Sequence, residues 1–544
     1  MAHPRHRLFT GVDRYTAAFR GGRMARSPHA LGGQEWTPAR LRTWLSALNA
    51  EEAIVVLANR EPFRHDHTAD GRIVFQHSTG GLVTALEPLI EACSGVWVAH
   101  GVGTADQVVV DERDRILVPP ASPRYRLRRV WLDACEEGGY YYGFANEGLW
   151  PLCHRAHVRP TFRPSDFSMY EAVNRRFARA VCEEVETDCP LVLVQDYHFA
   201  LAPQLIRQRL PFATIITFWH IPWPAPKEFA RCPWSRELLQ GLLGSSIIGL
   251  QTSEDCRNFI DNAARLLDAN VSRSRARIVH SGRHTLVRAY PVSIEWPNRW
   301  VGQSPPIETC RADVRRRLGL SADVLLGLGI DRLDYTKGIP EKFLAVERLL
   351  ESHPELCGQF VFVQIAEPSR ECLSAYRDLR SRIVAIADGI NARFGDQSYR
   401  PIVLLEGHHE PPEVYRFLRA ADVCYVGSLH DGMNLVAKEF VAAREDERGA
   451  LILSQFTGAA RELTSAVIID PYAIGDAARA LFRALFMSDE EQASRMRAMR
   501  SVVAASNTYK WAGAILADAM RVRALPSGSN SEIRVRWPDD AVHT

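Results

Sequence analysis

The stretches DRLDYTKG, residues 331–338, and DGMNLVAKE, residues 431–439, decide how this sequence folds. Each follows an apolar, strand-like run and leads into a helical pattern, so in a doubly wound sheet both would lie at the carboxyl ends of strands, where such folds bind ligands. The first stretch supplies the cations Arg332 and Lys337, and the second supplies a turn that opens a helix at about Asn434. A helix N-terminus offers unpaired N–H groups to an anion, and two cations can share the oxygens of a diphosphate. Together the stretches predict a phosphate site. Taken one at a time, these residues are more often surface charges and ordinary turns, so the inference rests on the joint pattern.

Strand-like and helical segments alternate along most of the chain, which is typical of an α/β protein. In the first part we expect a helix over 170–186 and strands over 54–58, 191–194, 214–219 and 247–250. In the second part we expect helices over 340–352 and 374–394, and strands over 324–330, 360–365, 402–406, 423–428, 450–454 and 466–469. The second series should form a parallel sheet, because helices fall between its strands.

The composition divides the chain into four parts. We expect residues 1–50 to form a mobile arm, rich in arginine, and a lead-in helix that starts near Thr37-Pro38. Two α/β domains follow, over residues 51–300 and 301–505, with a linker at 295–306 that contains four prolines or glycines. For residues 506–544 we expect a last helix over about 506–525, followed by a polar, disordered tail.

A hairpin-like excursion is expected at 107–142, within the first domain. Short apolar runs and polar turns break the helical alternation there. Tyr140 to Tyr142 would fit an amphipathic strand at its end, with only one of the three tyrosines facing a site.

Composition excludes several classes of protein. Lys and Arg number 66 against 64 Asp and Glu, so the net charge of +2 gives no reason to expect a nucleic-acid partner. No apolar run approaches the roughly 18 residues that a membrane span needs. The 11 cysteines are scattered without a C-x-x-C pair, which fits reduced thiols in a cytoplasmic protein and suggests no zinc site.

Further motifs carry a resemblance to a known family. They are Asn59-Arg60, Gly80-Gly81-Leu82, Tyr141 with Phe144 to Trp150-Pro151, QDYH at 195–198, HIPWP at 220–224, and QIA at 364–366 followed by Ser369-Arg370. With the two opening stretches, they resemble the trehalose-6-phosphate synthases, which are retaining glycosyltransferases. The resemblance keeps its order from about residue 53 to about residue 520.

The resemblance implies a fold and an activity. The fold would be α/β, with two Rossmann-like domains facing across a cleft (GT-B type) and a C-terminal helix that crosses back to the first domain. The activity would be transfer of glucose from a nucleotide-glucose, UDP-glucose by default, to glucose 6-phosphate with retention, giving trehalose 6-phosphate. The family is thought to use front-face attack, in which the leaving phosphate accepts the acceptor's proton, so no cofactor and no metal is expected. The partners would be the two substrates, with no membrane, and a homo-oligomer is left open.

The donor site follows from chemistry and from the resemblance. Stabilising a departing diphosphate is electrostatic work, for which Arg332 and Lys337 are the candidates. By resemblance, Asp431 and His220 contact the transferred glucose, and these four residues form the expected catalytic set. The resemblance also implies that the nucleotide-sugar is held by Gly81, by backbone groups of Met433, Asn434, Leu435 and Val436, and by Glu439 at the ribose.

The acceptor site is implied by the resemblance alone. Arg60 and Arg370 would hold the acceptor phosphate with the hydroxyl of Tyr141. Trp150 would supply an apolar wall, and Asp196 would bind acceptor hydroxyls.

Three departures from the common family pattern leave alternatives open. Ala58 replaces a serine, Gln195 a histidine, and His430 an arginine beside Asp431. Histidine is mostly neutral at pH 7, so ADP-glucose and GDP-glucose stay open as donors. The alternatives are a synthase that uses glycerol 3-phosphate or an aminocyclitol phosphate as acceptor, and a non-catalytic regulatory homologue. The presence of the catalytic cations argues against the last.

Overall fold

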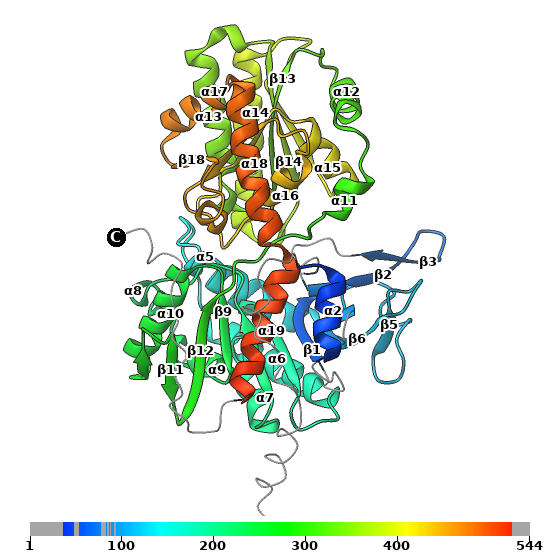
Figure 1. The fold of residues 1–544 in the computed structure, drawn as a ribbon, viewed down its shortest axis with the longest axis vertical. Coiled ribbons are helices and arrows are strands. Elements are labelled where there is room, and N and C mark those ends of the chain that lie inside the picture. The colour runs from blue at the N-terminus through cyan, green and yellow to red at the C-terminus, as the bar shows by residue number, and fades with distance from the viewer. Residues whose placement is uncertain are drawn as a thin grey trace, which may run out of the picture.

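The computed structural model describes residues 36–47, 54–77, 83, 86–87, 89–91 and 94–524. Most of the predicted N-terminal arm and the whole C-terminal tail lie outside the described residues. The chain forms two lobes stacked along the long axis of the molecule (Figure 1). We call the part around strands β1 to β12 the first lobe and the part around β13 to β18 the second lobe.

In the first lobe, ten strands of the described chain form one sheet in the order β10-β11-β12-β9-β8-β7-β1-β4-β6-β5. The strands from β12 across to β6 are parallel to one another, whereas β10, β11 and β5 are antiparallel additions at the edges. Their bounds are β1 Ile54–Arg60, β4 Val96–His100, β5 Arg115–Val118, β6 Tyr125–Val130, β7 Leu191–Gln195, β8 Thr214–Phe218, β9 Ile247–Leu250, β10 Asn270–Ser272, β11 Arg277–His280 and β12 Arg283–Ala289. A separate ribbon pairs β2 Phe63–His67 with β3 Ile73–His77. All four strands predicted for this lobe are confirmed.

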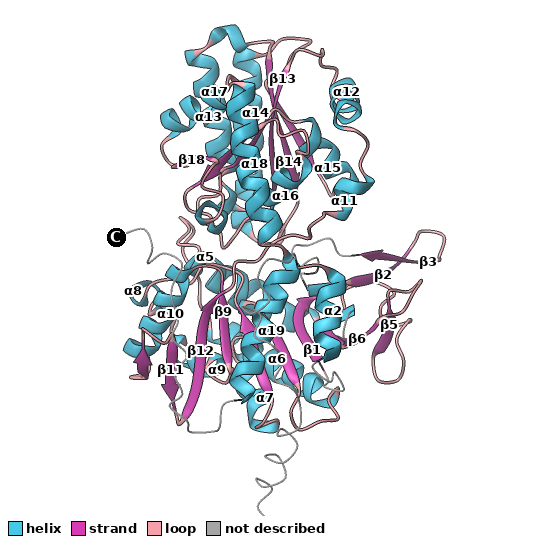
Figure 2. Ribbon diagram, in the orientation of Figure 1, coloured by secondary structure: helices cyan, strands magenta, loops and turns pink. Residues whose placement is uncertain are grey.

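Helices cover both faces of this sheet (Figure 2). They are α4 Ala134–Glu137, α5 Trp150–Cys153, α6 Pro164–Glu183, α7 Ala202–Arg209, α8 Pro226–Phe229, α9 Ser235–Leu242 and α10 Ser253–Leu266, with the short 3₁₀ turn η3 Tyr197–Phe199. The expected hairpin is present as β5 and β6, but the expected strand at Tyr140 to Tyr142 is wrong. These tyrosines lie in a π-helix, η2 Gly138–Leu149, which continues from α4 after a capping box at Asp133. The cap starts a helix there, and Tyr140 turns inward, where its hydroxyl donates to Asn59 Oδ1 at 2.8 Å.

The second lobe holds a six-stranded sheet, all parallel among the described strands, in the order β15-β14-β13-β16-β17-β18. The strands are β13 Leu325–Arg332, β14 Phe360–Glu367, β15 Ile402–Glu406, β16 Val423–Val426, β17 Ala450–Ser454 and β18 Val467–Ile469. The helices and 3₁₀ turns are α12 Ile307–Arg317, η4 Tyr335–Lys337, α13 Ile339–Ser352, η5 Pro354–Leu356, α14 Ser374–Phe394, α15 Pro411–Ala420, α16 Leu435–Ala443, η6 Gly458–Arg461, α17 Ile474–Leu485 and α18 Asp489–Ala505. The predicted parallel sheet is confirmed. It could be predicted because strands that are buried on both faces of a sheet appear in the sequence as unbroken apolar runs.

The described part of the chain passes between the lobes twice. The first passage follows Tyr290 and contains a short helix, α11 Arg299–Gln303, inside the predicted linker. The second is the break between α18 and α19 Thr508–Ala524, and α19 lies along the first lobe as predicted (Figure 1). The predicted domain limits at residues 50, 300 and 505 stay a prediction.

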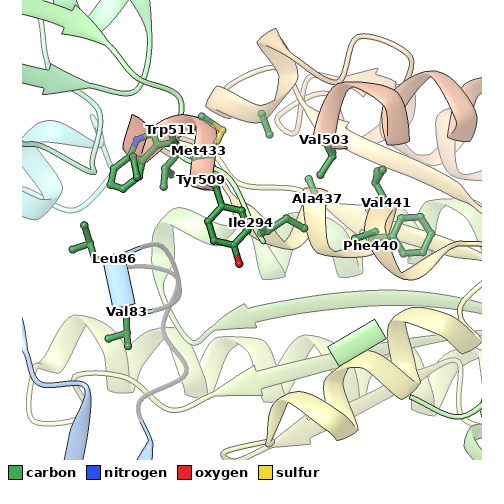
Figure 3. Packing of buried hydrophobic residues seen from close by; sticks show 14 of the residues in the cluster. Val83, Leu86, Ile294, Met433, Ala437, Phe440, Val441, Val503, Tyr509 and Trp511 are labelled. Atoms are coloured by element: carbon green, nitrogen blue, oxygen red, sulfur yellow. The ribbon is translucent and has the colours of Figure 1, made fainter. Parts of the chain in front are cut away.

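A continuous apolar core joins the lobes at these passages. Ile294, Met433, Val503 and Tyr509 come from the linker, the second lobe, α18 and α19, and all belong to one cluster of buried side chains (Figure 3). Trp511 extends the cluster into the first lobe, where its ring packs 5.2 Å from that of Phe218. The N-terminal helix α2 Pro38–Ala47 packs beside α19. In the described part of the chain, no helix is long and apolar enough to cross a membrane.

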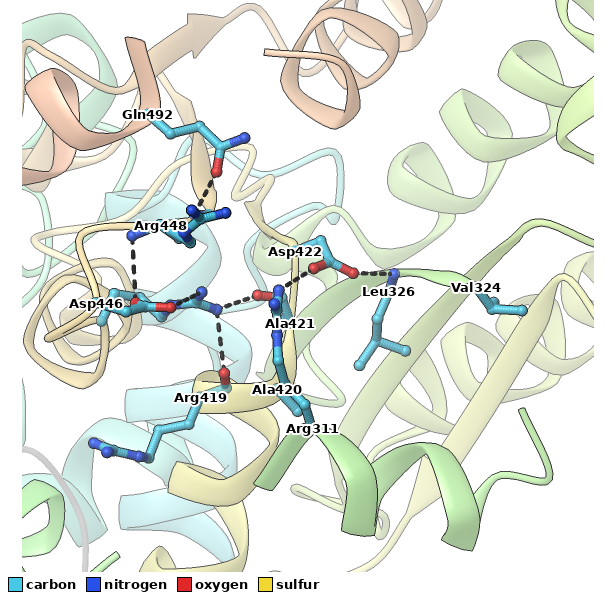
Figure 4. A network of polar contacts seen from close by, with 12 residues as sticks. Arg311, Val324, Leu326, Arg419, Ala420, Ala421, Asp422, Asp446, Arg448 and Gln492 are labelled. Atoms are coloured by element: carbon cyan, nitrogen blue, oxygen red, sulfur yellow. Dashed lines mark hydrogen bonds and ion pairs between the residues drawn. The ribbon is translucent and has the colours of Figure 1, made fainter. Parts of the chain in front are cut away.

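The amino-terminal edge of the second sheet is fixed by a polar network (Figure 4). Asp422, at the start of β16, accepts hydrogen bonds from the backbone of Leu326 at 2.8 Å and from Arg315 at 2.9 Å, and it pairs with Arg311. These contacts tie α12 to two strands at the edge opposite the predicted site. The network therefore stabilises the second lobe.

Replacing Asp422 by alanine should lower the free energy of unfolding of the second lobe by about 2–3 kcal/mol, because Arg315 is left largely buried without its acid. The control is Arg448→Ala, which breaks an exposed pair with Asp489 and should cost about 0.5 kcal/mol or less. Scanning calorimetry measures both. Equal losses in the two variants would contradict the structural role of Asp422.

Candidate functional site

The predicted site residues lie on the facing carboxyl edges of the two sheets. In the first lobe, Arg60 ends β1, while Asp196 and His220 follow β7 and β8. In the second lobe, Arg332 ends β13 and Asp431 follows β16. The fold therefore brings together residues that are far apart in the sequence.

The facing edges of the two sheets come into contact at Gly432. A Cβ atom added to Gly432 would lie 2.1 Å from the carbonyl oxygen of His220, far inside van der Waals contact. The turn of the second lobe thus rests directly on the end of β8. Only glycine fits at this contact.

Lys337 and Asp431 form an ion pair across the donor end of the site. The Asp431 carboxylate also accepts from Ser428 Oγ at 3.1 Å and from Asn434 Nδ2 at 3.2 Å. Burial alone would raise the pKa of Asp431, but Lys337 outweighs it and holds this pKa below its ordinary value. Asp431 is therefore ionised, and Lys337 is held in place before any ligand arrives.

The start of α16 carries the remaining donor candidates. Asn434 precedes the helix with φ at 69°, a strained value for a residue other than glycine, and its buried Oδ1 has no partner among the described residues. Met433 is buried, and Leu435 and Val436 are half-buried. On the next turn, burial raises the pKa of Glu439 to about 7. Gly81, the other donor candidate, lies outside the described residues.

His220 and Asp196 are linked to each other at the end of the first sheet. The backbone N–H of His220 donates to Asp196 Oδ1 at 3.1 Å, and His220 Nε2 lies 2.9 Å from Gln195 Oε1. Because an amide oxygen only accepts, Nε2 carries the hydrogen and Nδ1 is left as an acceptor. Burial lowers the pKa of His220 to about 3, so its ring is neutral at pH 7.

Asp196 is unusual in both its backbone and its charge. Its φ is 70°, in the left-handed region that non-glycine residues rarely adopt. Burial raises the pKa of its carboxyl group to about 7. Strain and a shifted pKa in one residue at a sheet edge are typical of a functional position.

Asp334 is a central residue that the sequence analysis missed. Its carboxylate accepts from Thr336 Oγ1 at 3.0 Å, Arg370 Nη1 at 3.2 Å, Trp150 Nε1 at 3.3 Å and the Tyr376 hydroxyl at 3.3 Å. Burial would raise the pKa of Asp334, but the nearby arginines lower it to about 2. One fully buried anion therefore joins Trp150 of the first lobe to three residues of the second.

Trp150 is more than an apolar wall. Arg370 lies over its ring with Cζ 4.2 Å from the centroid, and Arg332 lies 5.4 Å away. Such contacts are attractive when the cation is desolvated. Arg370 also donates to the Tyr197 hydroxyl at 3.2 Å, and its buried Nε has no partner within the described chain.

A pocket of about 670 Å³ opens between the lobes beside these residues. Arg60 and Tyr141 line it, and among the described residues the Arg60 side chain forms no ion pair or hydrogen bond. Burial would raise the pKa of Tyr141, but Arg370, Arg60 and Arg332 outweigh it, so the pKa falls below its ordinary value. The remaining lining residues are Asn59, Glu61, Arg64, Gln76, His77, His100, Val102, Glu137, Tyr142, Glu367, His408 and Glu410.

His408 to Glu410 form a loop, as expected, at the rim of this pocket. His408 lies 3.0 Å from Glu367 and 3.2 Å from Glu410. No group of three potential metal ligands occurs in the part of the chain that the structure describes. The expectation that no metal is needed stays a prediction.

The chain is similar to known proteins along most of its length. The model of glycosyltransferase family 20 matches residues 52–521. The trehalose-6-phosphate synthase of Mycobacterium sp. (strain KMS) is 38% identical over 477 residues, covering 86% of this chain and 95% of the relative. The solved E. coli structure bound with UDP-2-fluoro glucose is 30% identical with a TM-score of 0.77, covering 87% and 99% of the two chains. The trehalose-phosphate synthase of Burkholderia xenovorans in complex with glucose-6-phosphate is 29% identical with a TM-score of 0.75, covering 86% and 100%.

Replacing Gly432 by alanine should force the turn of the second lobe away from β8, because the added carbon has no room beside the His220 carbonyl. We expect amide hydrogens around residues 218–222 to exchange about tenfold faster or more, measured by mass spectrometry. Gly389→Ala is the matched control, since nothing lies within 4 Å of an added Cβ there. Unchanged exchange in the Gly432 variant would refute the close contact.

Proposed function

Because the chain belongs to glycosyltransferase family 20, we propose that it transfers glucose from UDP-glucose to glucose 6-phosphate, giving trehalose 6-phosphate. The enzyme is a retaining glycosyltransferase of the trehalose-phosphate synthase type. The proposal concerns its two substrates and the residues that hold them.

One observation carries the proposal. Arg60, whose side chain forms no ion pair or hydrogen bond with the described residues, lines the pocket between the lobes, while Arg332 and Lys337 lie on the facing sheet edge. Two separate anionic groups, a diphosphate and a sugar phosphate, would therefore each meet positive charge. The relatives with UDP-2-fluoro glucose and with glucose-6-phosphate support this pair of ligands.

The donor end would stabilise the leaving group. As the bond from the glucose anomeric carbon to the diphosphate breaks, the diphosphate keeps the electron pair, and Arg332 and Lys337 offset its charge. The acceptor hydroxyl oxygen bonds to the same face of that carbon, and its proton passes to the leaving diphosphate. Lys337 would exchange part of its contact with Asp431 for the diphosphate, which leaves the Asp431 carboxylate free to accept from a glucose hydroxyl.

The first lobe would orient both sugars. His220 is neutral and presents Nδ1 as an acceptor, so it fits a hydrogen bond from a hydroxyl of the donor glucose rather than a role as a cationic acid. The carboxylate of Asp196, whose backbone is strained, would accept from the acceptor hydroxyl. Arg60, Arg370 and Tyr141 would hold the acceptor phosphate, with Trp150 beneath Arg370.

Of the features of the two substrates, the nucleotide base of the donor is the one that the site residues constrain least. Burial lowers the pKa of His430 to about 4, so this position carries no charge at pH 7 where the family commonly has an arginine.

Kinetics with UDP-, ADP- and GDP-glucose, each combined with glucose 6-phosphate, glycerol 3-phosphate and an aminocyclitol phosphate, test the proposal. We expect kcat/KM to be highest for UDP-glucose with glucose 6-phosphate. Absence of transfer to glucose 6-phosphate from every donor would overturn it.

Arg332→Ala and Lys337→Ala should each lower kcat by about two orders of magnitude or more, because each removes charge that stabilises the departing diphosphate. Arg380→Ala is the control, since Arg380 is an exposed cation of the second lobe paired with Glu406. Steady-state kinetics of the folded variants measures the effect. Turnover within threefold of the parent enzyme in both site variants would exclude the electrostatic role.

Asp196→Asn tests the raised pKa. In the parent enzyme kcat/KM for the acceptor should fall as the pH drops below about 7, because the protonated carboxyl group is a poorer acceptor. In the Asp196→Asn variant this decrease should be absent. The only decrease in kcat/KM that remains should be the one near pH 6 caused by protonation of the sugar phosphate itself.

A second measurement on the same variant concerns stability. The folded pKa of Asp196 lies above its unfolded value, so ionisation destabilises the fold increasingly between about pH 4 and pH 7. The melting temperature of Asp196→Asn relative to the parent should therefore rise from pH 4 to pH 8. A difference that does not change with pH would show that Asp196 has an ordinary pKa.

A further inference from the structure

A buried glutamine, Gln251, lies at the carboxyl edge of the first sheet, between β9 and α10. The backbone on either side of it is fixed. Leu250 pairs with Ala289 of β12, and Thr252 caps α10. The side chain of Gln251 therefore starts from a rigid point beside β8, the neighbouring strand.

The amide group of Gln251 binds two backbone groups at once. Its Nε2 donates to the carbonyl oxygen of His220 at 3.3 Å, and its Oε1 accepts from the N–H of Val292 at 3.0 Å. A side-chain amide can donate and accept together without carrying a charge. Gln251 thus ties the residue that follows β8 to the segment that leads into the linker.

The second lobe holds the same segment from the other side. The carbonyl oxygen of Val292 accepts from Nζ of Lys438 at 2.9 Å, and this buried ammonium group pairs with Glu462 at 2.6 Å. Lys438 lies in α16, one turn beyond Asn434, which precedes that helix. A continuous chain of polar contacts therefore runs from His220 through Gln251 and Val292 to the helix that carries the donor candidates.

The His220 carbonyl is also the group on which Gly432 of the second lobe rests. Close packing from one lobe and a hydrogen bond from Gln251 thus act on a single peptide group. This group sets the position of the His220 ring relative to the turn before α16. Alignment of this kind matters for catalysis, because a displacement of about 1 Å between groups that hold a reacting molecule can cost about 100-fold in rate.

We propose that Gln251 is a positioning residue for the nucleotide-sugar, which keeps His220, the expected contact of the glucose, in register with α16, the expected contact of the diphosphate. This inference rests on the proposed function and extends it from the residues that touch the donor to one that aligns the two lobes on it. Gln251 would act only through His220 and Val292. Its loss should misalign the glucose with its leaving group.

The test replaces Gln251 by methionine, which has a similar volume and forms neither hydrogen bond. With UDP-glucose and glucose 6-phosphate as substrates, kcat/KM for the donor should fall about tenfold or more, with most of the loss in kcat. The KM for glucose 6-phosphate should stay within about twofold of the parent value. The Kd of UDP alone, measured by calorimetry, should also stay within about twofold, because the described candidates for the diphosphate lie in the second lobe.

Gln492→Met is the matched control. Gln492 bridges two backbone groups in the same way, since it accepts from the Gly449 N–H at 2.7 Å and donates to the Met487 carbonyl at 2.8 Å. It lies in α18, beside the network at the edge of the second sheet opposite the site (Figure 4). Its replacement should lower the melting temperature and leave kcat and both KM values of the folded enzyme unchanged.

The outcomes separate the inference from the proposed function. A parent enzyme that transfers no glucose to glucose 6-phosphate overturns the proposed function and the inference with it. An active parent, together with a folded Gln251→Met variant whose kcat falls less than about threefold, overturns the inference alone. Equal kinetic losses in the Gln251 and Gln492 variants also overturn it, because they mark a general loss of structure. If Gln251→Met does not fold, Gln251→Asn decides, since its amide is one carbon shorter and cannot span both backbone groups. An unchanged kcat in that variant refutes the positioning role.

Discussion

The buried carboxylate of Asp334 is the interaction on which the site depends. It is fully enclosed, yet ionised, because Arg370 and Arg332 lie beside it and four side chains from both lobes donate to it. Removing such a charge would leave Arg370 buried without its acid and Trp150 without a partner, which is costly in a dry interior. The same contact sets the distance between the lobes, because Trp150 and Asp334 come from opposite sides of the pocket. Binding groups on both sheet edges therefore share one fixed reference point.

Two lysines at or near the candidate site are paired with protein carboxylates. Lys337 is held by Asp431, and the buried Lys342 of α13 is held by Asp331 of β13, which also accepts from Gln364 at 3.1 Å. The outer pair can exchange partners with a ligand, whereas the inner pair is enclosed and serves the sheet. Cations held by protein acids need little reorganisation when the ligand arrives, which is the condition under which electrostatic stabilisation is most effective.

Sequence alone predicted the second lobe well, because its parallel strands are buried on both faces and read as continuous apolar runs, such as Phe360 to Glu367. It missed β3, whose residues are mostly exposed, and β11, which has a mixed polar pattern. It also missed β2, β10, β12 and β4, although β4 is buried along its whole length. The alternative that it gave for Tyr140 to Tyr142, an amphipathic strand, is wrong, since neighbouring aromatic residues fit either period. Motif positions gave most candidate site residues, and the fold places the described ones on two facing edges. Asp334 was out of reach, because its role arises from contacts such as that with Trp150, 184 positions away.

The second crossing of the chain has a consequence for the order in which the protein can form during synthesis. Helix α19 packs Trp511 on Phe218, and Trp511 donates to the Tyr290 carbonyl at 3.2 Å, while Asp518 accepts from the Tyr290 hydroxyl at 2.9 Å. The first lobe is therefore translated first but lacks part of its core until the ribosome has passed residue 524. The second lobe has all its strands by residue 469 and can close earlier. The half that is made first is completed last, so the apolar surface around Phe218 stays uncovered by α19 during much of translation, when such surface is prone to aggregation.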